Sequence, residues 1–96
     1  GQPLSAEQAE RAGLVSECVP AQELEARSLD LAGRIAAMPP LAVRQIKEVM
    51  QLGADLSLQG ALALERKANQ VLFASKDQKE GMQAFIEKRR PLWRGE

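Results

Sequence analysis

The chain has 96 residues, of which 45% are hydrophobic and 27% charged, so we expect one small soluble domain with a single, modest core. Thirteen basic and thirteen acidic residues cancel without any long run of like charge, which argues against nucleic acid and a membrane surface as partners. The chain has no His and a single Cys, which excludes a Ser-His-Asp triad, a Cys-His pair and the usual metal-ligand sets.

The first predicted element is a short helix. Residues 5–8, Ser-Ala-Glu-Gln, have the form of a capping box, and the helix should run from there to Ala12. Gly13 suits a left-handed cap at the end of this helix. Residues 14–19 then predict a short extended segment that needs a partner. This segment must pair outside the chain, pair between copies, or stay irregular.

Apolar residues recur at helical spacing through most of the remaining chain. We expect an amphipathic helix over 22–38 that ends at Pro39-Pro40, because proline stops one helix and suits the first turn of the next. A second helix should run from about Pro40 to Leu52 and be capped by Gly53.

The last third of the sequence predicts two more helices. Asp55 or Ser57 can cap a helix that runs to about Ala74. Its predicted apolar stripe consists of Leu58, Ala61, Leu62, Leu72 and Phe73. Ser75 with Gln78 repeats the capping-box form and opens a final helix that ends before Pro91. The fold class is therefore all-α, with four to five short helices in one domain over residues 1–96.

The chain shows no targeting or anchoring signal. Its apolar runs are only a few residues long, and the first residues lack the layout of a signal peptide. Cys18, the only cysteine, fits a reducing compartment and is expected to be a small buried residue. These features predict a cytoplasmic protein that does not engage a membrane.

Four stretches together resemble a known family. The first covers residues 1–20, with Gly-Leu-Val at 13–15 and Val-Pro at 19–20, and the second runs from Ala32 through Pro39-Pro40 with Lys47 beyond it. The third is Glu65 within the long helix. The fourth and most specific covers residues 80–91 and has the pattern E-G-M-x-A-F-x-E-K-R-x-P. This series resembles the C-terminal third of crotonase-superfamily subunits, the enoyl-CoA hydratases and isomerases.

The resemblance implies a larger subunit. In the family, an N-terminal α/β spiral core binds acyl-CoA, two glutamates activate water and protonate the α-carbon, and two backbone amides stabilise the enolate; helices like these build a trimer. The catalytic elements lie upstream of the match to Gly1, so we expect a fragment that carries no catalytic residue of its own. Its partners would be other copies of the same subunit and acyl-CoA at the subunit edge, with no cofactor and no metal.

Two residues match positions that contact CoA in the family. Lys88 resembles the lysine that reaches a neighbouring subunit's CoA phosphate, and Phe85 resembles an aromatic residue that lines the same edge. A compact ammonium on a flexible stem suits a phosphate. The alternative is that the cations of residues 88–90 favour a helix C-terminus and that Phe85 belongs to the core.

Lys47 and Glu65 fall on or beside apolar stripes of neighbouring helices, so each predicts a partner. A structural ion pair between them would clamp the two helices. The alternative, in which each side chain extends to solvent at the edge of its stripe, stays open.

Three further residues invite a role. Asp77 and Glu80 share a helix face, but Asp77 fits the first turn of a helix, and Glu80 should pair with Lys76 or Lys79 or stay solvated. Trp93 is expected to anchor the tail onto the body or to lie in an interface.

The leading hypothesis is an oligomerisation and CoA-edge segment of an acyl-CoA hydratase or isomerase. A free-standing helical interaction module and an autonomous enzyme using carboxylate chemistry are the alternatives. The sequence does not decide the acyl group or the reaction, because fold membership does not settle chemistry.

Overall fold

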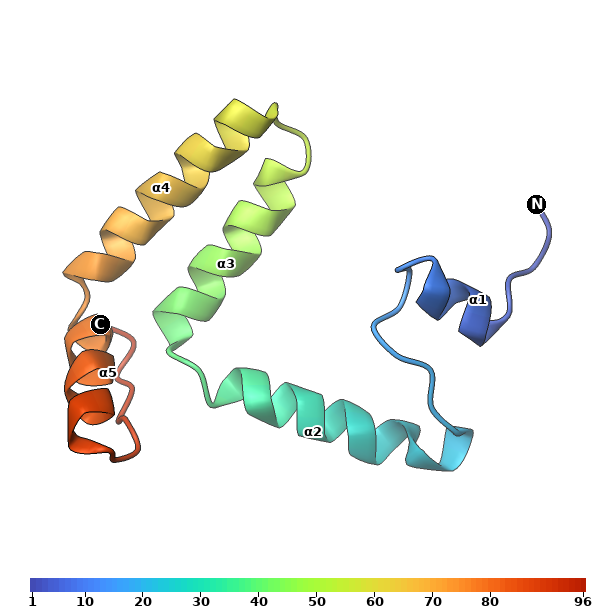
Figure 1. The fold of residues 1–96 in the computed structure, drawn as a ribbon, viewed down its shortest axis with the longest axis horizontal. Coiled ribbons are helices and arrows are strands. Elements are labelled where there is room, and N and C mark those ends of the chain that lie inside the picture. The colour runs from blue at the N-terminus through green and yellow to red at the C-terminus, as the bar shows by residue number, and fades with distance from the viewer. The chain divides into compact units, whose positions relative to one another are not determined.

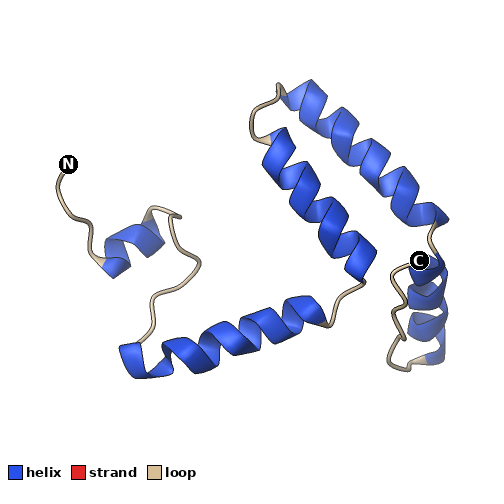
Figure 2. Cartoon of the chain, turned by 180° about the vertical axis from the view of Figure 1, so that it is seen from behind, coloured by secondary structure: helices blue, strands red, loops and turns tan.

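A computed structural model describes all 96 residues and contains helices but no strand (Figure 2). The elements are α1 (Ala6–Arg11), a 3₁₀ turn η1 (Ala21–Glu23), α2 (Leu24–Ala36), α3 (Pro40–Gly53), α4 (Leu58–Ala74) and α5 (Lys76–Glu87), as Figure 1 shows. The predicted all-α class is confirmed. None of these helices combines the length and the apolar character that crossing a bilayer requires. The chain divides into two compact units, residues 1–32 and 33–96, which we describe in turn.

In the first unit, α1 has the predicted capping box. The Gln8 amide donates to Ser5 Oγ at 3.2 Å, and the Ser5 amide donates to Gln8 Oε1 at 2.8 Å. The helix ends at Arg11, one residue earlier than predicted. Gly13 takes the left-handed conformation, with φ +73, and the Leu14 amide returns to the Ala9 carbonyl at 2.9 Å. Glycine has no β-carbon to oppose this conformation, so the cap forms without strain.

Residues 14–19 form no strand and stay irregular, which is one of the three alternatives that the sequence left open. An ion pair holds this segment to α2: Arg27 Nε lies 2.8 Å from Glu17 Oε1, and Arg27 Nη1 lies 2.9 Å from Asp30. Cys18 is only half-buried, so the expectation of a buried cysteine is wrong: it lies in an irregular segment whose residues 14–16 are exposed.

In the second unit, α3 and α4 lie side by side as an antiparallel hairpin (Figures 1 and 2). Pro40 opens α3, as predicted, but the helix continues through Gly53, so the predicted glycine cap is wrong. Ser57 rather than Asp55 caps α4, because its hydroxyl accepts the Gly60 amide at 3.2 Å.

Ser75 joins α4 to α5. Its hydroxyl donates to the Leu72 carbonyl at 2.7 Å and accepts the Gln78 amide at 3.1 Å. The Ser75 amide donates to the same Leu72 carbonyl, at 3.1 Å, and is therefore unavailable to the Gln78 side chain. Only half of the second predicted capping box forms, since the turn out of α4 already uses the other donor.

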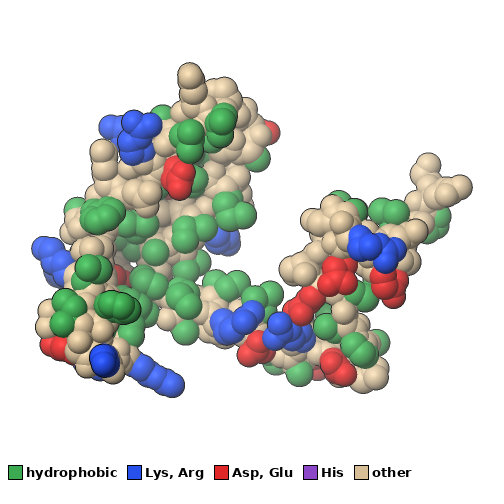
Figure 3. Space-filling view, in the orientation of Figure 1, with side chains coloured by type: hydrophobic (Ala, Val, Ile, Leu, Met, Phe, Trp, Pro, Cys, Tyr) green, Lys and Arg blue, Asp and Glu red, His purple; other side chains and the backbone are tan.

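The core within the chain is very small. Ala68 and Ala84 are the only buried apolar residues. The apolar stripe predicted for α4 exists as a pattern but faces outward, with Leu58 76% and Phe73 70% exposed. Figure 3 accordingly shows hydrophobic side chains spread over the surface of the unit formed by residues 33–96. Serine caps start α4 and α5 and a proline starts α3, while most of the large apolar side chains remain exposed.

Candidate functional site

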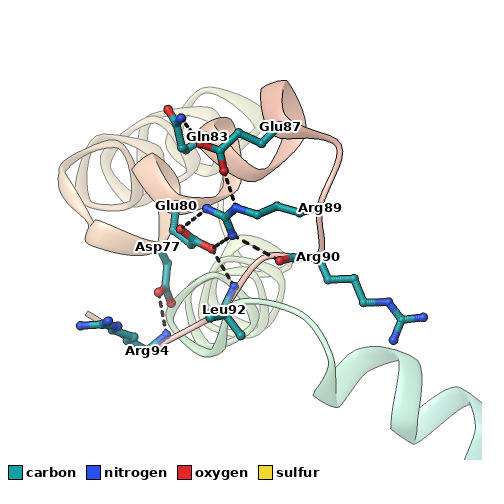
Figure 4. A network of polar contacts seen from close by, with 8 residues as sticks. All are labelled: Asp77, Glu80, Gln83, Glu87, Arg89, Arg90, Leu92 and Arg94. Atoms are coloured by element: carbon teal, nitrogen blue, oxygen red, sulfur yellow. Dashed lines mark hydrogen bonds and ion pairs between the residues drawn. The ribbon is translucent and has the colours of Figure 1, made fainter.

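The residues after α5 fold back along this helix and form the most highly connected part of the chain (Figure 4). We call residues 88–96 the tail and the contacts that hold it to α5 the tail clamp. The reversal occurs at Lys88, whose φ of 54 is left-handed. The Lys88 amide donates to the Phe85 carbonyl at 3.3 Å, and the Arg89 amide donates to the Ala84 carbonyl at 3.0 Å. A non-glycine residue in this conformation costs about 1–2 kcal/mol.

Glu80 is the central acceptor of the tail clamp. Its two oxygens accept from Arg89 Nη1 at 2.6 Å and Nη2 at 2.9 Å, and Oε1 also accepts the Leu92 amide at 2.8 Å (Figure 4). The two-pronged contact with Arg89, followed by the Leu92 amide, lowers the pKa of Glu80 from 4.5 to about 2. The same contact raises the pKa of Arg89. Glu80 is therefore a carboxylate throughout the physiological pH range.

Asp77 holds the end of the tail. Its side chain is buried, at 3% exposure, and it accepts the Arg94 amide at 2.7 Å and the Gly95 amide at 2.8 Å. Hydrogen bonds from backbone donors satisfy a buried carboxylate, so this residue has a structural role that its place in the first turn of α5 does not by itself reveal.

Trp93 anchors the middle of the tail, which decides between the two roles predicted for it. Its indole Nε1 donates to the Ala37 carbonyl at 2.9 Å. The ring lies against Gly81, where a β-carbon would come within 3.1 Å of Trp93 Cη2. A side chain at position 81 would therefore displace the ring by a few tenths of an ångström. The tail links α5 to the turn that precedes α3.

An open apolar groove of about 310 Å³ lies next to Trp93. Its apolar walls come from the start of α3, the end of α4 and the middle of α5, and they consist of Pro39, Leu41, Ala42, Leu72 and Met82. The groove continues the exposed apolar surface of this unit.

Lys88 and Phe85, the residues predicted to contact CoA, lie together at the C-terminal end of α5. The backbone hydrogen bond between them fixes their spacing. Phe85 is 81% exposed, so it belongs to no core within this chain. Lys88 is exposed, and its ammonium has no hydrogen-bond or ion-pair partner. Both side chains are available to a ligand.

Lys47 and Glu65 are both exposed, and no ion pair joins them. Glu65 lines a small open hollow of about 220 Å³ between α3 and α4 together with Ile46 and Met50. The ion pair between Lys47 and Glu65 does not form within this chain, and it stays a prediction.

Glu80 was expected to pair with Lys76 or Lys79 or to stay solvated, and this prediction is wrong. Lys76 pairs with Glu96. The partner of Glu80 is Arg89, which lies nine residues further along the chain. The physical reason is the reversal at Lys88, which carries Arg89 back across α5. The only signal in the sequence was indirect: Pro91 showed that the helix must stop before it, and Asp77 and Glu80 lie on one face of that helix.

Comparison with known proteins shows what the chain is similar to. The profile of the enoyl-CoA hydratase/isomerase family matches residues 1–96. The chain is 43% identical over 93 residues to a probable mitochondrial enoyl-CoA hydratase of Dictyostelium discoideum, covering 97% of this chain and 34% of that protein. It is 37% identical over 95 residues to 2,3-dehydroadipyl-CoA hydratase of Escherichia coli, covering 99% and 37%.

Solved structures give the same result. The chain superposes on an enoyl-CoA hydratase from Bacillus anthracis with a TM-score of 0.93 and 40% identity, covering 100% of this chain and 37% of that one. The TM-score with an enoyl-CoA hydratase subunit from Geobacillus kaustophilus is 0.88, with 47% identity and coverage of 97% and 36%. The chain spans about a third of the length of the relatives it matches. It belongs to the enoyl-CoA hydratase/isomerase family.

Proposed function

We propose that this chain is the oligomerisation and CoA-edge segment of an enoyl-CoA hydratase or isomerase subunit. The observation that carries the proposal is the uncovered apolar surface on well-capped helices. Nineteen large hydrophobic residues are exposed, and no large side chain is fully buried. Exposed apolar area of this extent is typical of a surface that another protein covers.

Copies of the same subunit are the partners that this surface fits. The exposed residues include large aliphatic and aromatic side chains on successive helices, such as Met50, Phe73 and Phe85. Such residues are enriched in the cores of interfaces between identical subunits. Trimeric assembly, which the family resemblance implies, would cover them.

The reaction belongs to the longer subunit. We propose that its α/β portion binds a 2-enoyl-CoA thioester and hydrates or isomerises it through an enolate, without a cofactor, in the cytoplasm. Residues 1–96 form a single helical domain of that subunit and supply no catalytic group. The names of the relatives support thioester hydration, since they include an enoyl-CoA hydratase and 2,3-dehydroadipyl-CoA hydratase.

Lys88 and Phe85 would contact CoA at the edge of the subunit. An ammonium without a protein partner can bind a phosphate as a point charge. Phe85, exposed beside it, offers a flat apolar surface to the rest of the CoA nucleotide. The acyl group would lie elsewhere, in the portion of the subunit that performs the chemistry.

Light scattering of the 96-residue chain over a range of concentrations tests the oligomerisation role. We expect association that weakens in Phe73→Ser, because the exposed ring is then replaced by a polar group. Gln70→Ser, one turn away on the exposed side of α4, is the matched control and should leave association unchanged. A compact monomer at all concentrations would contradict the proposal and favour the free-standing interaction module.

A further inference from the structure

We propose that Glu80 is a positioning residue for Lys88, so that binding of the phosphate-bearing part of acyl-CoA depends on a carboxylate that does not touch it. The inference rests on the proposed role of Lys88 at the CoA edge. Its basis is the geometry of the tail clamp around a strained residue.

The chain contains the same helix-ending motif twice, once with glycine and once with lysine. At Gly13 and at Lys88 the residue has a positive φ, of 73 and 54, and the next amide returns to a carbonyl five residues earlier. Glycine adopts this conformation freely, whereas lysine does not. A residue kept in an unfavourable conformation indicates that its side chain is needed or that its surroundings impose the turn.

The surroundings impose the turn through Glu80. Arg89 directly follows Lys88, and Leu92 lies four residues beyond it; both donate to the Glu80 carboxylate, at distances of 2.6 to 2.9 Å (Figure 4). The lysine is therefore flanked by α5 on one side and by two attachments to Glu80 on the other. These attachments are the first side-chain contacts after Lys88, and they add to the Arg89 amide's bond to the Ala84 carbonyl in favouring the left-handed conformation.

No hydrogen bond or ion pair holds the Lys88 side chain in place. Its ammonium lacks a hydrogen-bond or ion-pair partner, so the direction in which it leaves the chain is set by its backbone alone. When the backbone is already fixed, binding an anion costs only the conformational entropy of the side chain itself. If the backbone at Lys88 were mobile, its conformational entropy would also be lost on binding, and the affinity would fall.

Other members of the clamp act at different points. Asp77 holds residues 94 and 95, at the far end of the tail. Glu87 also contacts Arg89, but it is the last residue of α5 and lies only two positions away, so it ties Arg89 to the end of the helix and not across the turn. Glu80 alone accepts from both sides of Pro91, through Arg89 and Leu92.

The test uses the full-length subunit that contains this chain and two substrates, a 2-enoyl-CoA and the same 2-enoyl group on pantetheine, which lacks the nucleotide and its phosphates. KM and kcat are measured for Lys88→Met, Glu80→Gln and the double variant. Glu25→Gln, the same change at an exposed position of α2, is the matched control and should match the parent.

We expect Lys88→Met to raise KM for the CoA substrate roughly tenfold, the loss of one charge-assisted contact to phosphate. Glu80→Gln should raise the same KM by roughly three- to tenfold, leaving kcat and the pantetheine KM unchanged. The double variant should be no worse than Lys88→Met, since two residues that act through one contact are not additive. Arg89→Gln, which opens the clamp from its other side, should reproduce Glu80→Gln.

The outcomes separate the inference from the proposed function. If Lys88→Met affects both substrates equally, the CoA-edge role is wrong and the inference fails with it. If Lys88→Met distinguishes the substrates but Glu80→Gln and Arg89→Gln do not, only the positioning role is overturned. It is also overturned if Glu80→Gln lowers kcat, raises KM for both substrates, or adds its full effect to that of Lys88→Met.

Discussion

Gly81 and Trp93 fit against each other so closely that a β-carbon on Gly81 would lie 3.1 Å from Cη2 and 3.3 Å from Cζ3 of the indole. The only tryptophan of the chain is thus positioned by the absence of a side chain in the middle of α5. The indole also donates to the Ala37 carbonyl, 56 residues away in sequence. This fit allows the tail to be probed by fluorescence.

Gly81→Ala should displace the tryptophan even though alanine favours the helix. The new methyl group would meet the ring at 3.1 Å, so the indole must move by a few tenths of an ångström, which strains its hydrogen bond to Ala37. We expect a red-shifted emission of Trp93 and a lower melting temperature. Gly33→Ala in α2 is the control: nothing lies within 4 Å of its added carbon, so it should gain about 0.5–1 kcal/mol from helix propensity. Equal stabilisation by both substitutions would show that the contact is unimportant.

Asp77→Asn should destabilise the tail by about 1–3 kcal/mol, because the amide keeps one acceptor oxygen and leaves one buried backbone donor unpaired. The measurement is the free energy of unfolding in urea, together with hydrogen exchange of the Arg94 and Gly95 amides, which donate to Asp77. Asp55→Asn in the exposed α3–α4 loop is the control and should change neither. Unchanged exchange at residues 94 and 95 would contradict the assigned role of Asp77.

Acidification should release the tail between about pH 4.5 and pH 2. The pKa of Glu80 is lowered from 4.5 to about 2 in the folded chain, so the unfolded chain binds the proton first as the pH falls. The stabilisation from Glu80 is therefore complete above pH 4.5 and disappears as the pH falls through this window. Trp93 fluorescence follows the change.

Glu80→Gln should remove this part of the acid transition. Glu87→Gln should remove a separate part, because the pKa of Glu87 is also lowered, first by Gln83 and then by Arg89. An acid transition of the same size in Glu80→Gln and the parent would show that Glu80 does not hold the tail.

Lys88→Gly should stabilise the chain while weakening CoA binding in the full-length subunit. Glycine relieves the left-handed strain of about 1–2 kcal/mol but loses more backbone entropy on folding, which leaves a net gain of about 0.5–1 kcal/mol. Thermal unfolding of Lys88→Gly and Lys88→Ala provides the comparison, since alanine also lacks the ammonium but keeps the strain. A glycine variant no more stable than the alanine variant would exclude strain at this position.

The sequence predicted those parts of the fold that depend on near neighbours. The capping box of α1, the Gly13 cap, the proline at the start of α3 and the Ser57 cap all rest on hydrogen bonds within about five residues. Amphipathic spacing likewise located each long helix. The spacing did not show that the apolar stripes stay exposed in this chain. The same sequence pattern arises whether a stripe packs within its own chain or against another one.

The tail clamp could not be predicted from the same signals. Its contacts join residues up to twenty positions apart and depend on a left-handed turn at a lysine, a conformation that sequence patterns assign to glycine. Asp77 and Glu80 were recognised as lying on one face, but their partners are mostly backbone amides, which carry no residue signature. The CoA-edge residues came from the family resemblance and remain to be tested by binding.

The double use of Ser75 limits how α5 can move. One hydroxyl closes α4 through the Leu72 carbonyl and opens α5 through the Gln78 amide, so no flexible spacer separates the helices. Swinging α5 outward would break one of these bonds and expose a buried hydroxyl. A displacement at the C-terminal end of α5 would therefore be transmitted to α4 through the Ser75 hydroxyl.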